Sequence, residues 1–125
     1  MKTLECSSRG DKRFSAFYAR VKVYGKVDSI ENHYQLAKRF GNGPAPKTWR
    51  DGKGKKPTHF ELNGKKFPLE KGLDFYNWLW AGYLNNNPEL VVYLNKFDAY
   101  NDMFAKPGNV NQADAIKTYM DSLPF

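Results

Sequence analysis

Three polar side chains between Glu31 and Lys38 are the best placed in this chain to do chemistry together. Glu31, Gln35 and Lys38 follow one another at intervals of four and three residues, and residues at i, i+4 and i+7 share one face of a helix. A carboxylate, an amide and an ammonium group would then point the same way, next to an aromatic-rich segment that begins at Phe14. This arrangement predicts a ligand pocket.

A purely structural interpretation of the same helix stays open. Asp28 is followed three residues later by Glu31, which is the pattern of a capping box with Asp28 as the N-cap. Ile30, Tyr34 and Ala37 would form the apolar side of the helix, so the opposite, polar stripe would simply face solvent.

The elements around these residues follow from hydropathy and turn signals. Residues 14–27 alternate apolar and polar side chains, which predicts a half-buried strand that ends at Gly25. A helix is expected from Ser29 to Phe40, and the glycines and prolines of residues 41–46 then break regular structure. Residues 47–56, KTWRDGKGKK, are either a solvated surface loop or a phosphate clamp in which Trp49 packs on a ring.

The second half of the chain predicts a hairpin and three helices. Asn63-Gly64 lies between two strand-like runs, 59–62 and 65–69, and favours a type I′ turn. Helical spacing of large side chains predicts a core helix, a second helix opened by an Asn-Pro pair, and a last helix that begins near Asn111. The apolar positions of these three helices are Leu73, Tyr76, Trp80 and Tyr83, then Leu90, Leu94 and Phe97, then Ala113, Ile116 and Met120.

Length and composition favour one domain covering residues 1–125, of the α+β class and predominantly helical, with a short N-terminal strand region and a β-hairpin. No stretch approaches the roughly 20 apolar residues of a membrane span, and the first residues lack a signal-peptide pattern, so we expect a cytoplasmic protein. Cys6 is the only cysteine and His33 and His59 are the only histidines. A metal site is therefore not expected.

The net charge of +7 is concentrated in the first part of the chain. Residues 1–70 hold sixteen Lys and Arg against seven Asp and Glu, whereas residues 71–125 hold four against six. Such asymmetry favours a phosphate-bearing or polyanionic partner on the N-terminal side. Many proteins carry comparable charge only for solubility, and that explanation stays open.

Several motifs occur here in the order found in NADAR domains, and the chain resembles that family over most of its length. The motifs are Phe14-Ser15-Ala16-Phe17, Gly25-Lys26, Ser29 to Lys38, Trp49, Asn87 to Leu90, and Asp98 to Asp102 followed by Gly108 and Asn111. The Asn63-Gly64 hairpin has no place in the family pattern as we know it.

The resemblance implies cleavage of an N-glycosidic bond in an ADP-ribosyl-type nucleotide substrate, without an organic cofactor. Some NADAR proteins remove ADP-ribose from guanine bases of nucleic acid, and others hydrolyse a phosphoribosyl-amine intermediate of riboflavin synthesis. The basic first half favours nucleic acid over the small metabolite. A non-catalytic binder of single-stranded nucleic acid, a protein that sequesters a nucleotide derived from ADP-ribose, and a small protein-interaction domain are the alternatives.

The resemblance also implies roles for individual residues. Glu31 would stabilise positive charge at the anomeric carbon or activate water, and Asp102 would orient that water or hold a ribose hydroxyl. Lys38 would assist the leaving group, bind phosphate, or form an imine with the opened sugar. The expected substrate-binding residues are Arg13 for phosphate, Gln35 and Asn111 for base or ribose, and Phe17, Trp49 and Tyr100 for stacking.

Two of these binding residues have an equally simple structural interpretation. Asn111 is also placed as a helix N-cap, and Phe17 is also expected in the core, because aromatic side chains are often buried.

Two positions depart from the family pattern. Ala16 stands where FSNF would have an asparagine, and Tyr100-Asn101-Asp102 stands where Trp-Gly-Asp is usual. A tyrosine can still stack on a ring and the carboxylate is kept, so an altered substrate is favoured over an inactive site.

Overall fold

The computed structural model describes residues 1–124. One long helix and several short ones make up 39% of the residues, and strands make up 19%. The expected α+β class is confirmed, whereas a predominantly helical composition is not. The helices are α1 (Ile30–Leu36), α2 (Trp49–Gly52), α3 (Gly72–Asn85), α4 (Pro88–Leu94) and α5 (Gln112–Asp121), with 3₁₀ turns η1 (Lys12–Phe14) and η2 (Leu69–Lys71).

The strands form three small sheets. β1 (Thr3–Glu5) pairs in parallel with β7 (Ala99–Asn101), which ties the first residues of the chain to a segment near its end. β2 (Arg20–Val23) and β3 (Lys26–Ser29) form an antiparallel hairpin. β4 (Lys38–Arg39), β5 (His59–Leu62) and β6 (Lys65–Pro68) form an antiparallel sheet in that order.

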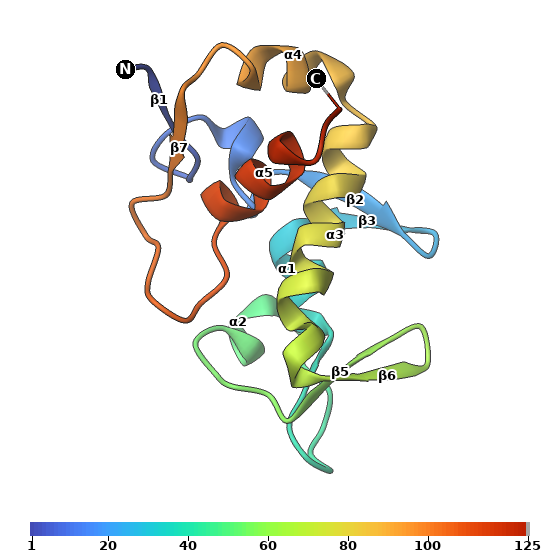
Figure 1. Ribbon diagram of the computed structural model, residues 1–125. Coiled ribbons are helices and arrows are strands. Elements are labelled where there is room, and N and C mark those ends of the chain that lie inside the picture. Colours follow the sequence, from blue (N-terminus) through green and yellow to red (C-terminus); the bar gives the residue numbers. More distant parts are fainter. Residues whose placement is uncertain (125) are drawn as a thin grey trace.

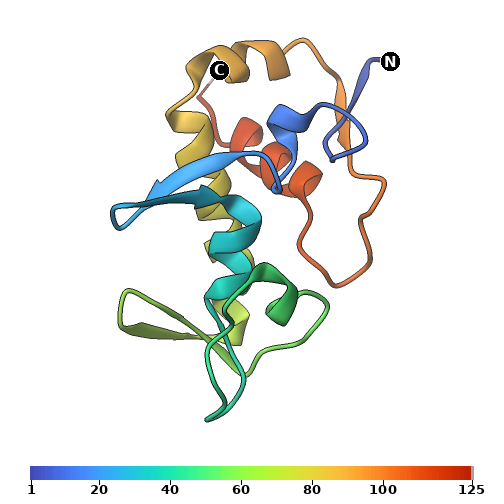
Figure 2. The ribbon, with the colours of Figure 1, turned by 180° about the vertical axis from the view of Figure 1, so that it is seen from behind.

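Helix α3 is the central element of the fold. In Figure 1 it runs from the β5–β6 hairpin at one end of the molecule to α4 at the other, and it packs against α5, α1 and β2. Figure 2 shows α1 and the β2–β3 hairpin in front of it, seen from behind. The predicted core residues Tyr76, Trp80 and Tyr83 are buried, but Leu73 is exposed, so the prediction was wrong for Leu73.

The predicted strand over residues 14–27 is wrong in its first half. Phe14 ends the turn η1, which Asp11 caps by accepting a hydrogen bond from the backbone N–H of Arg13 at 3.1 Å. Residues 15–19 form a turn whose amides and carbonyls bond within the segment and to the start of α1. Phe14, fully buried, therefore packs into the core from a turn, although its apolar spacing resembles that of a strand residue.

The second half of that segment is a hairpin instead of one strand. Val21 and Val23 are buried in β2, as the alternation predicts. The chain reverses at Tyr24 and Gly25, whose φ angles of 48° and 82° are those of a tight turn with two left-handed residues. Lys26 then begins β3, which pairs with β2 and leads directly into α1.

The predicted helix 29–40 is shorter and begins differently. Its N-cap is Ser29, whose hydroxyl accepts a hydrogen bond from the Asn32 backbone N–H at 3.0 Å. Asp28 is still paired with Val21 in β3, so it cannot be the cap, and no capping box with Glu31 forms. Helix α1 ends at Leu36 because the chain then enters β4 and pairs with β5.

The predictions for the later elements are mostly confirmed. Asn63 and Gly64 have φ angles of 52° and 80° and connect β5 to β6 as expected for a type I′ turn. Pro88 occupies the first turn of α4, but the side chain of Asn87 donates to the Tyr83 carbonyl at 2.7 Å instead of capping the helix. No helix within residues 1–124 is long and apolar enough to cross a bilayer.

The apolar sides of the last two helices also agree with their spacing. Leu90 and Leu94 of α4 and Ala113 and Ile116 of α5 are buried, and Met120 is partly buried. Phe97, which lies beyond the end of α4, is partly buried against the same core.

The buried thiol of Cys6 gives a direct probe of the fold. Cys6 is fully buried, and desolvation raises the pKa of its thiol to about 12. We expect slow alkylation of the native chain at pH 8 and fast alkylation in urea, measured by mass spectrometry. Because the unfolded thiol releases its proton at a lower pH than the folded one, stability should fall as the pH rises above about 9. Fast labelling of the native chain would contradict the burial of Cys6, directly after β1.

Candidate functional site

Glu31 lies buried in the first turn of α1, where two long-range backbone bonds fix the helix start. The Ile30 N–H donates to the Ala19 carbonyl and the Glu31 N–H to the Ala16 carbonyl, both at 2.9 Å. These bonds satisfy amides that a helix leaves unpaired at its N-terminus. Only 5% of the surface of residue Glu31 is exposed, so the surrounding residues fix the position of its carboxylate.

The hydrogen bonds of this carboxylate all fall on one oxygen. Oε1 of Glu31 accepts from Gln35 Nε2 at 3.1 Å and from Lys53 Nζ at 3.2 Å. Oε2 accepts none from residues 1–124 and is not among the fully enclosed atoms of that part of the chain. Glu31 and Gln35 thus lie together as their spacing predicts, with one carboxylate oxygen free to meet a ligand.

Gln35 presents an unpaired group at the same place. The side chain is buried and donates to Glu31, but its Oε1 has no hydrogen-bond partner within residues 1–124. A buried amide oxygen without a partner costs free energy. This oxygen is enclosed, so a ligand meets it only after a local movement of the Gln35 side chain.

Lys38 reaches the cluster from β4 and not, as its spacing predicts, from the α1 helix. Its Nζ donates to the carbonyls of Gly52 and Lys55, each at 3.0 Å, and lies 5.5 Å from the ring of Tyr34. Burial lowers the pKa of this ammonium group. Lys38 therefore holds the 52–55 segment to β4, just beyond the end of α1, with one of its three N–H donors unassigned.

The basic segment 47–56 contains the short helix α2, which packs on α1. Trp49 meets the ring of Phe17 edge to face, with 5.1 Å between centroids, and the Arg50 guanidinium lies 4.6 Å from the Trp49 ring. Phe17 is 40% exposed, so the core interpretation of this residue was wrong. An accessible aromatic pair stands next to the buried carboxylate.

Lys53 is a residue of this cluster that the sequence reasoning did not single out. Its side chain is 51% exposed, yet its Nζ bonds the buried Glu31 carboxylate and lies 5.5 Å from the Phe17 ring. In the sequence, Lys53 is one of several lysines in the basic, glycine-bearing segment 47–56, and nothing local distinguishes it from the others. We call the residues Phe17, Glu31, Gln35, Lys38, Trp49 and Lys53 the Glu31 cluster.

Asp102 lies in a second place, at a cleft of about 370 Å³ between the end of β7, the 102–111 loop and the start of α5. Its Oδ2 accepts from Gln112 Nε2 at 2.7 Å, and its Oδ1 accepts from the Phe104 N–H at 3.0 Å. Gln112 in turn accepts from the Ala16 N–H at 2.7 Å. Because the Ala16 carbonyl accepts from the Glu31 N–H, Asp102 is connected to the Glu31 backbone through Gln112 and the backbone of Ala16.

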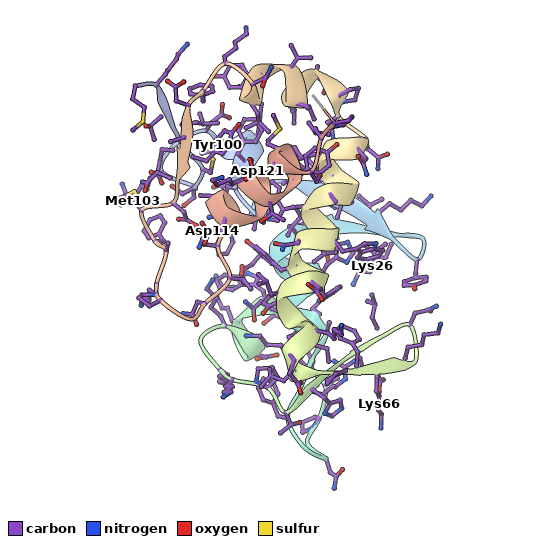
Figure 3. The ribbon with its side chains drawn as sticks, in the orientation of Figure 1. Lys26, Lys66, Tyr100, Met103, Asp114 and Asp121 are labelled. Carbon is purple, nitrogen blue, oxygen red and sulfur yellow. The ribbon has the colours of Figure 1, made fainter. Side chains whose placement is uncertain are left out.

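Tyr100 and Asn111 also line this cleft, and both are engaged within the protein. The Tyr100 hydroxyl donates to the Leu94 carbonyl at 2.9 Å, and Asn111 caps α5 by accepting from the Asp114 N–H at 2.9 Å. Figure 3 labels Tyr100 and Asp114 on β7 and α5, the two elements that bound the cleft. The N-cap interpretation of Asn111 is confirmed.

Arg13 is bonded outside the Glu31 cluster. Its guanidinium forms two hydrogen bonds to the Asp11 carboxylate, the shorter at 2.6 Å, and lies 4.4 Å from the Tyr93 ring. The hydrogen bond from Arg13 lowers the pKa of the Asp11 carboxyl. A phosphate contact by Arg13 would compete with this pair.

Gly52 allows α2 to approach α1 closely enough to build the cluster. A Cβ at this position would lie 2.9 Å from the Gln35 carbonyl oxygen and 3.0 Å from Gln35 Oε1. We expect Gly52→Ala to displace the segment that carries Lys53, to lower the free energy of unfolding by about 1–3 kcal/mol, and to reduce ligand affinity. Urea denaturation and ligand titration check both effects. Gly54→Ala, at an open position with a φ of 74°, should affect stability without moving Gln35.

The comparisons with known proteins agree with the resemblance found in the motifs. Residues 1–122 match a family model described as DarT1-associated NADAR antitoxin. No curated protein matches this chain. Since the matched range takes in the Glu31 cluster and the Asp102 cleft alike, the chain belongs to the NADAR-DarT1 family, the DarT1-associated NADAR antitoxins.

Proposed function

We propose that this protein is an N-glycosidase that removes ADP-ribose from guanine bases of nucleic acid, and that this reaction is its antitoxin activity. The single observation that carries the proposal is the buried Glu31 carboxylate with its unpaired Oε2. An antitoxin that is a glycosidase would act by reversing a modification, so the family description and the proposed chemistry are consistent.

The reaction needs a carboxylate at the anomeric carbon. As the bond from C1′ of the ribose to the guanine nitrogen breaks, its electron pair leaves with the base and positive charge develops at C1′. Oε2 of Glu31 is free to stabilise that charge or to take a proton from the attacking water. The hydroxyl from water ends on C1′ and the base nitrogen gains a proton, which gives free ADP-ribose and unmodified guanine.

The other residues of the cluster supply binding and orientation. Gln35 holds the Glu31 carboxylate through the 3.1 Å hydrogen bond from its Nε2. Its enclosed Oε1 would accept from a base N–H or a ribose hydroxyl after the side chain turns on substrate binding. Phe17 and Trp49 offer a surface on which a purine ring can stack. Lys53, half exposed, can leave Glu31 for a substrate phosphate, which would free the carboxylate as the substrate arrives.

For Lys38 two features support two roles. Its bonds to the Gly52 and Lys55 carbonyls support a role in holding the segment that carries Lys53. Its lowered pKa supports attack as a free amine on the opened sugar, since burial favours the neutral form. Borohydride reduction during turnover separates them: a covalent ADP-ribosyl adduct on Lys38 assigns the amine role, and its absence assigns the holding role.

The Ala16 departure leaves the framework of the site intact. Ala16 holds Gln112 and Glu31 through its backbone N–H and carbonyl, which any residue possesses. What is missing relative to FSNF is one amide side chain next to Glu31. This favours a changed contact with the substrate over loss of the carboxylate.

The test offers three substrates in parallel: a guanine-ADP-ribosylated oligonucleotide, the corresponding free nucleoside conjugate, and a phosphoribosyl-amine. Release of ADP-ribose from the oligonucleotide supports the proposal. Cleavage of the phosphoribosyl-amine alone places the enzyme in small-molecule metabolism. Tight binding with the ligand recovered unchanged would make the protein a sequestering binder and overturn the proposal.

A further inference from the structure

One face and the tip of the β2–β3 hairpin are exposed, and no other part of residues 1–124 covers them. Val21 and Val23 point into the core from β2, while Arg20 and Lys22 lie on the opposite, exposed face. Val27, the partner of Lys22 across the hairpin, is exposed as well. The hairpin therefore presents cations around an apolar position, directed away from the core.

The tip of the hairpin carries an aromatic residue that does not pack against the core. Tyr24 is 64% exposed and adopts a φ of 48°. Glycine, asparagine and aspartate are favoured at such left-handed turn positions, and a tyrosine is unfavourable there. Since Tyr24 gains no burial in return, its aromatic ring is best explained by contact with a partner.

The charges around the tip are almost all positive. Arg20, Lys22 and Lys26 are exposed, and Lys12 lies 5.0 Å from the ring of exposed Tyr18 on the adjoining turn. The one carboxylate in the hairpin, Asp28, is 3.8 Å from Lys26 and is already bonded to Ser29 and Asn32. The surface thus combines cations with the exposed aromatic rings of Tyr18 and Tyr24.

This surface is continuous in the chain with the Glu31 cluster. β3 ends at Ser29 and Glu31 follows in the first turn of α1, while Phe17 and Tyr18 precede β2 on the other side. The base of the hairpin also adjoins the start of α1 in space, because the Ile30 N–H donates to the Ala19 carbonyl at 2.9 Å. A strand with one nucleotide at Glu31 could therefore continue onto the hairpin.

We propose that the β2–β3 hairpin binds single-stranded nucleic acid next to the modified nucleotide, with Arg20, Lys22 and Lys26 on phosphates and Tyr24 stacked on an unpaired base. Cations with interleaved aromatic rings are the usual chemistry of single-strand binding. The inference deepens the proposed function by naming where its nucleic-acid substrate is held, and it rests on that function only for the placement of the modified base.

The test measures binding of an unmodified, fluorescent single-stranded oligonucleotide by anisotropy over a series of salt concentrations. We expect Lys22→Ala/Lys26→Ala to weaken binding roughly tenfold at low salt and to lower the salt slope by about 1.4, as for two lost phosphate contacts. Lys65→Ala/Lys66→Ala is the matched control, because it removes the same charge from exposed positions of the β5–β6 hairpin. Figure 3 shows Lys26 and Lys66 on these two separate hairpins.

A second variant tests the aromatic tip without harming the turn. Tyr24→Asn suits the left-handed backbone, so the melting temperature should be unchanged or higher, whereas affinity should fall at least fivefold through lost stacking. Equal losses in the two lysine pairs, or full affinity in Tyr24→Asn, would overturn the proposal, as would binding of duplex in preference to the single strand. Because the oligonucleotide is unmodified, the inference can stand even where no ADP-ribose is released, and it can fail while release proceeds.

Discussion

Glu31→Gln should lower kcat for the release of ADP-ribose by roughly 10²–10⁴-fold. The variant should remain folded. The change removes the negative charge that would stabilise the anomeric centre and keeps the size of the side chain. The new amide still has an oxygen that can accept from Gln35 or Lys53, as Oε1 does in the native chain. Initial rates on a guanine-ADP-ribosylated oligonucleotide check the kinetic effect.

The matched control for this variant is Glu61→Gln. Glu61 lies in β5, partly exposed, with Arg39 as its charged neighbour at 3.9 Å. The same change of charge there should alter kcat less than twofold. A Glu31→Gln protein with native kcat would remove the carboxylate from the mechanism, and an equal loss in both variants would show a general charge effect.

Asp102→Asn should lower the free energy of unfolding by about 1–3 kcal/mol and also reduce kcat. Both oxygens of the native carboxylate accept hydrogen bonds, from Gln112 Nε2 and from the Phe104 N–H. The asparagine side chain can accept only at its Oδ1, because its Nδ2 is a donor. One of the two native donors would then face the Nδ2 group without an acceptor. We infer that Asp102 is a positioning residue, which acts on the start of α1 at Glu31 through Gln112 and the backbone N–H and carbonyl of Ala16.

A positioning role makes a different prediction from direct contact with water or ribose. Gln112→Leu, which keeps Asp102 but cuts the connection, should reduce kcat as much as Asp102→Asn does. Asp114→Asn is the control, since Asp114 lines the same cleft on its exposed side. Native activity in Gln112→Leu together with a large loss in Asp102→Asn would contradict the positioning role. Urea denaturation and kcat on the same preparations provide both readouts.

The parts of the site that lie within one helix could be predicted from the sequence. Glu31 and Gln35 are four residues apart, and that spacing alone brings them together in α1. Lys38 reaches the same cluster for a different reason, since the helix has ended and β4 carries it. The spacing therefore predicted that the three side chains lie near one another, but it placed Lys38 on the wrong element.

The contacts that close the site could not be predicted, because they join distant segments. Lys53 meets Glu31 across 22 residues of sequence, and Gln112 meets Ala16 across 96. No local periodicity encodes such pairs. Residues 14–27 also show that a local pattern is not sufficient. Their alternation of apolar and polar side chains corresponds to a strand only in β2, and a turn before β2 and a hairpin after it replace the rest of the expected strand.

The measurement that tests the central claim most directly is the mass of both products after the native chain is incubated with a guanine-ADP-ribosylated oligonucleotide. Cleavage of the N-glycosidic bond predicts free ADP-ribose and an oligonucleotide with its guanine intact. An oligonucleotide that keeps its ADP-ribose, that has lost the base, or that retains a phosphoribosyl remnant on the guanine would contradict the account.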